Sequence, residues 1–138
     1  MVEKIRANAA LVVRIAGEKL GVPIDYDEAG VRWLDGYIQE QHESGDPSAR
    51  GGLVSTLGSY LGECIIRTHG GEWAEVGGNW CVRFDDGASA NPFAKVAKQL
   101  DHGSEDSVLG FFTVLPMLFR HLRSLAQPQP DVRTEPPP

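Results

Sequence analysis

One acidic residue lies where a buried side chain is expected. Glu63 lies beside Tyr60 and Cys64 in a stretch whose apolar residues recur every three or four positions. Because a buried carboxylate needs a partner, we expect Glu63 to pair with Arg67, four residues on, or with Lys95. The same group would be a weak candidate for a general base if burial favoured its protonated form. We interpret Glu63 first as a structural ion-pair member or an exposed residue, and second as a catalytic group.

Metal and thiol chemistry have less support in the sequence. The four histidines do not have the spacing of a metal-binding motif; they are His42, His69, His102 and His121. Cys64 and Cys81 form no C-x-x-C pair, and Cys64 fits the pattern of a small apolar core residue. A disulfide between the two cysteines is the less favoured alternative. We therefore predict no metal site and no cofactor.

Aromatic residues could form the walls of a small-molecule pocket, although in a chain of this size they more often belong to the core. The relevant side chains are Trp33, Trp73, Trp80, Tyr37 and Tyr60. Alternation along a predicted hairpin places Trp73 and Trp80 on opposite faces, with one of them exposed to a partner. The residues that we assign to a candidate binding surface are Trp73, Trp80, Tyr60, Arg67 and Lys95.

The charge of the chain limits its partners. With 138 residues, a net charge of -6 and an isoelectric point near 5.1, the protein lacks the excess of Lys and Arg that binding to nucleic acid or an anionic membrane requires. Acidic residues are densest from Asp25 to Asp46. This run would attract a basic partner or, more simply, form a solvated helix face. We expect a cytoplasmic protein with reduced thiols.

A helix within the stretch from Arg50 to Trp73 is predicted to be the centre of the domain. Asp46-Pro47 is its predicted opening, and Gly51-Gly52 leave open that the regular helix begins only near Leu53. Its apolar side is accompanied by a strip of small residues, which would let another part of the chain approach the helix axis; the strip consists of Gly51, Ser55, Gly58 and Gly62. Each Gly in an exposed helix costs about 1 kcal/mol relative to Ala, so close packing is the expected reason for the strip. Gly70, in a left-handed conformation, is the predicted end.

The remaining elements give an α+β fold. We predict two helices before the central one, at 3–20 and from the N-cap Asp27 to about 41, and then strands at 72–76 and 79–84 with a short third strand at 88–90. Two helices follow, one opened by Asn91-Pro92 and a last one capped by Ser104 and bent by Pro116. The prediction is thus three helices, a small antiparallel β-meander of two or three strands and two more helices in a single domain, residues 1–126. A disordered Pro-rich tail, residues 127–138, follows.

The last predicted helix is apolar on nearly every side from Val108 onward. Such a helix is either central to the fold or shared between subunits, so a homodimer through this helix is one of our predictions. The apolar run is about a dozen residues long, shorter than the roughly 20 that a membrane span needs. Cys81 is predicted to face away from Trp80 and Val82 on the second strand.

Three segments carry a resemblance to a known family. They are LGSYLGE at 57–63, GGEW at 70–73 and NPFAKVAKQL at 91–100. In this order they resemble a family of small bacterial domains of unknown function with LGxYLGE, GGxW and NPFxKVxKxL segments, over about Asp25 to Ser107. The resemblance implies a bacterial source and an α+β fold, and it implies no activity, cofactor or catalytic residue.

These observations favour a non-enzymatic bacterial protein-binding module. A more specific version is a toxin-neutralising, immunity-like protein, in which the acidic surface speeds association with a basic toxin. The alternative is a small-molecule-binding or hydrolytic enzyme centred on Glu63. An enzyme requires a concave site with converging polar groups, whereas a binding module requires an unusually large apolar or acidic surface.

Overall fold

The computed structural model describes residues 1–126, apart from the side chains of Phe119, Leu122, Arg123 and Ala126, and it has the predicted α+β order. The helices are α1 (Val2–Leu20), α2 (Glu28–Ser44), α3 (Arg50–His69), α4 (Pro92–His102) and α5 (Val108–Ala126), with 3₁₀ turns at Pro47–Ala49 and Gly103–Asp106. The strands are β1 (Glu72–Val76), β2 (Asn79–Arg83) and β3 (Ser89–Ala90). The predicted disordered tail lies outside the described residues.

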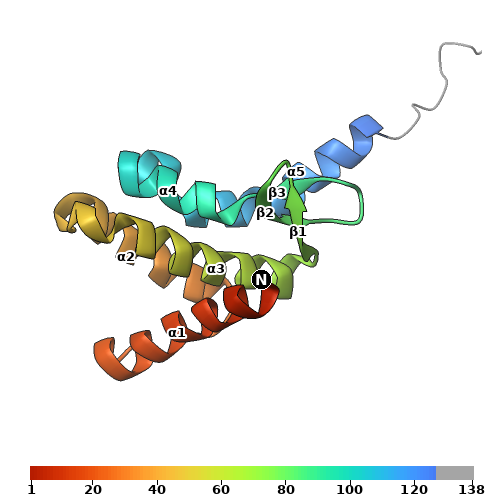
Figure 1. The fold of residues 1–138 in the computed structure, drawn as a ribbon. Helices are drawn as coiled ribbons and strands as arrows, with labels where there is room; N and C mark the ends of the chain where they lie inside the picture. Colours follow the sequence, from red (N-terminus) through yellow and green to blue (C-terminus); the bar gives the residue numbers. More distant parts are fainter. Residues whose placement is uncertain (127–138) are drawn as a thin grey trace, which may run out of the picture.

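Helix α3 lies at the centre of the described structure. Helices α1 and α4 flank it on opposite sides, and the small sheet lies near its C-terminal end (Figure 1). Every residue from Leu57 to Ile65 is buried, so this part of the helix is covered all round rather than on one face. The prediction of a central helix is therefore confirmed.

The small-residue strip on α3 allows two aromatic rings to approach its backbone. A Cβ atom at Gly62 would lie 2.1 Å from the Trp73 ring, and one at Gly58 would lie 2.4 Å from the Phe93 ring. Both distances are far below van der Waals contact. Gly51, at the open end of the strip, has no neighbour within 4 Å of the corresponding position. Close packing thus explains Gly58 and Gly62 but not Gly51.

The sheet is a meander in the order β1-β2-β3 with antiparallel pairs. Trp73 pairs with Val82 and Glu75 pairs with Trp80, so all four side chains lie on the same face of the sheet. The prediction that Trp73 and Trp80 lie on opposite faces is wrong. A two-residue turn pairs odd-numbered residues of β1 with even-numbered residues of β2. Paired residues share a face of the sheet, so the odd-numbered Trp73 and the even-numbered Trp80 lie on the same face.

The prediction for Cys81 is right about the face of the strand and wrong about its exposure to solvent. Its side chain does lie on the face opposite Trp80, but Cys81 is only 6% exposed. Burial raises the pKa of its thiol. Alternation along a strand identifies the two faces, yet it does not reveal that both are covered. Both cysteines are free.

Two of the predicted helix caps are present in the structure, and two other predicted helix ends differ from it. The side chains of Asp27 and Asn91 accept hydrogen bonds from the amides of Gly30 and Ala94, as N-caps of α2 and α4 do. Gly70 ends α3 with φ 90° and ψ −172°, which is not the predicted left-handed helical conformation. Ser107, and not Ser104, caps α5, because its hydroxyl accepts from the amide of Gly110.

A buried polar network, absent from the sequence-based predictions, positions the start of α5. Gln99 is fully buried; its Oε1 accepts from the Val108 amide at 2.8 Å, and its Nε2 donates to Asp35 Oδ1 at 3.0 Å. The other oxygen of Asp35 accepts from the Ser107 hydroxyl and from the Leu109 amide. These bonds join α2, α4 and α5, so residue 107 is fixed by the tertiary structure before the helix begins.

Helix α5 is buried over only part of its length. Val108, Phe112 and Leu115 are at most 1% exposed, whereas Met117 is 62% and Leu125 is 65% exposed. The interpretation of α5 as central therefore holds only for its first two turns. Within residues 1–126, no helix combines the length and apolarity that a membrane crossing requires.

Pro116 removes a hydrogen bond inside α5, and a histidine from α3 replaces it. Pro116 has no N–H to donate to the carbonyl of Phe112, four residues earlier. The Nε2 atom of His69 lies 3.1 Å from this carbonyl oxygen, and the two rings contact each other at 4.6 Å between centroids. His69 therefore joins the end of α3 to α5. Burial lowers the pKa of His69.

The close packing of α3 predicts opposite effects for two Gly→Ala changes. Gly62→Ala should lower the free energy of unfolding by about 1–3 kcal/mol, because the new methyl group overlaps the Trp73 ring. Gly36→Ala, in an exposed part of α2 with nothing within 4 Å, should raise it by about 0.5–1 kcal/mol. Urea unfolding of the two variants measures both. Equal effects would contradict the packing argument.

The lowered pKa of His69 predicts a pH dependence of stability. The unfolded chain takes up a proton near pH 6.5 and the folded state does so only at lower pH, so stability falls as the pH drops through this range. We expect the unfolding midpoint to fall less between about pH 7.5 and pH 5.5 in His69→Gln than in the wild type. His121→Gln, at an exposed position of α5, serves as the control and should retain the wild-type slope.

Candidate functional site

Glu63 is the centre of a buried polar cluster at the junction of α1, α3 and β1. Its side chain is 5% exposed. One oxygen, Oε2, accepts from the Trp73 indole N–H at 2.8 Å and lies 3.9 Å from Arg6 Nε, and the other accepts from Arg67 at 3.2 Å. The expected pairing with Arg67 is therefore present. The pairing with Trp73 and Arg6 connects elements that are distant in the sequence.

A layer of aromatic rings continues from this cluster. The guanidinium of Arg67 lies 3.8 Å from the centroid of the Tyr26 ring, and Tyr26 in turn packs against Tyr60. The Tyr60 hydroxyl donates to the carbonyl oxygen of Asp25, and burial raises the pKa of this phenol far above its usual range. Tyr60 thus fixes the connection between α1 and α2 against α3.

The geometry of the cluster favours structure over acid-base chemistry. Each oxygen of Glu63 already accepts a hydrogen bond from the protein, and the side chain is only 5% exposed, so little of the carboxylate is accessible to a substrate. Burial raises the pKa of the neighbouring Cys64 thiol to about 12, so this cysteine is a poor nucleophile near neutral pH. Residues 1–126 contain no group of three or more His, Cys, Asp or Glu side chains suited to a metal ion.

The residues assigned to a binding surface do not form one site. Three of them belong to the Glu63 cluster and the aromatic layer beside it: Arg67, Trp73 and Tyr60. Lys95 lies on another part of the surface, with its ammonium 4.6 Å from the centroid of the Phe111 ring.

Trp80 lines a separate cavity of about 360 Å³ between α1, α3, the hairpin and the start of α4. Lys4, Asn8 and Ser55 contribute to its wall and were missed from the sequence. The only signal was that Ser55 belongs to the small-residue strip of α3.

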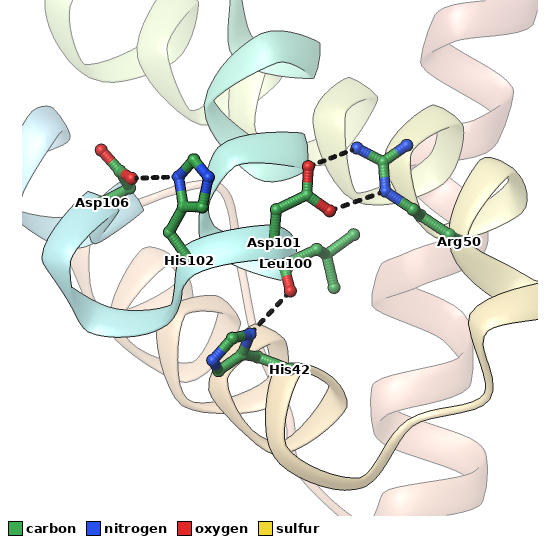
Figure 2. Close-up of polar contacts among 6 residues, drawn as sticks. All are labelled: His42, Arg50, Leu100, Asp101, His102 and Asp106. Atoms are coloured by element: carbon green, nitrogen blue, oxygen red, sulfur yellow. Dashed lines mark hydrogen bonds and ion pairs between the residues drawn. The ribbon is translucent and has the colours of Figure 1, made fainter.

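A second polar cluster, separate from the Glu63 cluster, lies where the ends of α2 and α4 meet the start of α3 (Figure 2). Arg50 forms two hydrogen bonds of 2.8 and 2.9 Å with the Asp101 carboxylate, and these bonds lower the pKa of Asp101. His42 Nδ1 lies 2.7 Å from the carbonyl oxygen of Leu100, in the last turn of α4. His102 and Asp106 form a further exposed contact of 2.9 Å.

This second cluster supplies a hydrogen-bond partner to the C-terminal end of α4. The last carbonyls of a helix lack partners within the helix, and His42 supplies one to Leu100. His42 also lies against Gly103, where a Cβ atom would come within 2.9 Å of its ring. The arrangement therefore has a clear structural role, similar to that of His69 at Phe112.

The Glu63 cluster predicts a specific energetic coupling. Glu63→Leu should lower the free energy of unfolding by about 1–3 kcal/mol, because the buried Trp73 N–H loses its acceptor. In a Trp73→Phe background this cost should shrink by about 1 kcal/mol, as a double-mutant cycle in urea would measure. Glu28→Leu, which breaks the exposed pair with Arg32, should cost no more than about 0.5 kcal/mol. Equal costs for the two glutamates would show that the Glu63 cluster is not structural.

Comparisons of the chain with protein-family models, with curated proteins and with solved structures found no match. The resemblance to a family of small bacterial domains stays a prediction from the three sequence segments.

Proposed function

We propose that this protein is a non-enzymatic protein-binding module and that the second half of α5 is its contact surface. The observation that carries the proposal is a row of exposed apolar side chains on this helix. Val114 is 46%, Met117 62%, Leu118 42% and Leu125 65% exposed. Isolated exposed apolar residues are ordinary, but four on one side of the same helix are characteristic of a surface that another protein covers.

The spacing of these residues suits a helical partner. Positions 114, 117, 118 and 125 follow intervals of three, four and seven, so the side chains lie along one side of the helix. The row extends over about 17 Å at the helical rise per residue. A helix laid along it would cover all four side chains, in the manner of an amphipathic helix bound in a groove.

A second copy of the chain is the partner that we propose. In a twofold dimer the same row serves both subunits, so one apolar surface is complementary to itself. In a twofold antiparallel pair that buries this row on both sides, the two α5 helices cross near the midpoint of the row, at about residue 120. Val114 of one copy then lies near Leu125 of the other.

A basic partner bound to the acidic run from Asp25 to Asp46, such as a toxin, receives less support. Several of these carboxylates are already engaged by the chain itself: Asp27 caps α2, Glu28 pairs with Arg32, and Asp35 holds the start of α5. An enzyme centred on Glu63 is supported less for a similar reason, because its buried carboxylate is engaged by Trp73 and Arg67. We therefore place the contact surface on α5 and not on α2 or α3.

The proposal predicts a dimer that depends on α5. Light scattering after size exclusion should give a mass that rises toward twice the monomer mass as the concentration increases from about 5 to about 500 µM, since a contact of this size is weak. The double variant Met117→Glu/Leu118→Glu should remain a monomer throughout, because two carboxylates would be buried in the contact.

Leu20→Glu is the matched control, since Leu20 is 49% exposed and lies on α1. It should dimerise like the wild type. A wild-type protein that stays monomeric at the highest concentration would refute the second copy as the partner.

A further inference from the structure

The cavity beside Trp80 is an open hollow lined by both apolar and polar residues. It measures about 360 Å³, at the lower end of the range for small-molecule sites. Ile5 is 4% and Ser59 1% exposed, so these two residues form its deep part, and the rings of Trp80 and Phe93 contribute aromatic wall. Four elements distant in the sequence thus enclose one hollow.

The cavity exists because the small-residue strip of α3 is only partly filled. Phe93 covers Gly58 and Trp73 covers Gly62, but the cavity remains open beside Ser55 and Ser59. The Ser59 hydroxyl donates to the Ser55 carbonyl at 2.7 Å, so its own proton is engaged. The hollow therefore lies beside the small side chains of Ser55 and Ser59 on α3.

The charge of the cavity wall differs from that of the whole protein. The protein carries a net charge of -6, yet none of the described residues that line the cavity is Asp or Glu. Lys4 is a cationic side chain in the wall, and it forms no ion pair with any residue from 1 to 126. The indole N–H of Trp80 and the side-chain amide of Asn79 also have no hydrogen-bond partner within this range.

We propose that this cavity binds a small planar organic anion, with an aromatic carboxylate as the chemical class. Lys4, Asn79 and Trp80 line the cavity and carry an ammonium, an amide and an indole N–H. Donors of these kinds suit a carboxylate, because hydrogen bonds to an ionised acceptor are the stronger kind. The aromatic wall suits a flat ring, which stacks or packs edge to face with such side chains. This site does not involve α5 and is independent of the proposed dimer contact.

The experiment uses 2-naphthoate as the probe, with the neutral 2-naphthamide and the cationic 2-naphthylmethylamine as comparisons. Each compound is titrated into ¹⁵N-labelled full-length protein. We expect 2-naphthoate to shift the indole N–H signal of Trp80, identified by its loss in Trp80→Phe, more than those of Trp33 and Trp73. The affinity should follow the order anion, neutral amide, cation.

Two lysine variants test the role of charge. Lys4→Gln should weaken 2-naphthoate about fivefold or more and leave 2-naphthamide unchanged, because the charged hydrogen bond is lost. Lys98→Gln, at an exposed position of α4 outside the cavity wall, should leave both affinities unchanged. The proposal is overturned if 2-naphthoate causes no shift at Trp80, if the cation binds as tightly as the anion, or if Lys4→Gln and Lys98→Gln have the same effect.

Discussion

The close approach of two aromatic rings to the backbone of α3 is the constraint on which the rest of the structure depends. Trp73 can lie over Gly62, and Phe93 over Gly58, only because neither glycine has a side chain. A three-stranded meander has little stability of its own, so its position is set by what it packs against. Here Trp73 both fills the space at Gly62 and ends in a hydrogen bond to Glu63. The sheet, α3 and α4 are thereby fixed by the same few atoms.

Side chains that bind backbone groups of other elements complete this arrangement. His69 binds the carbonyl that Pro116 leaves without a partner, His42 binds one at the end of α4, and the amide side chain of Gln99 spans from α2 to α5. Each of these bonds satisfies a polar group that would be costly to bury alone. The same bonds give His69, His42 and Gln99 clear structural roles.

The elements that depend on local signals could be predicted from the sequence. Asp27 and Asn91 cap their helices because a cap needs only the amides two or three residues on, and the glycine strip marked the centre of the fold because it is a periodic pattern. The relative faces of Trp73 and Trp80 also follow from a local signal, the two-residue turn at Gly77-Gly78, and were assigned wrongly because such a turn pairs odd-numbered with even-numbered residues. The cap of α5 could not be predicted locally, because Asp35 and Gln99, which are distant in the sequence, hold Ser107 and the start of the helix. The pairing of Glu63 with Arg67 was predictable at i, i+4, but its pairing with Trp73 was not.

The strand order β1-β2-β3 places β1 at the rim of the sheet, with a neighbour on one side only. An unpaired strand rim can recruit a strand from another molecule and so start aggregation. Two of the five residues of β1 are exposed glutamates, Glu72 and Glu75, which point to opposite faces. Their negative charges repel an identical strand from either face. The two glutamates therefore protect the free rim of the sheet against pairing with the same strand of a second copy.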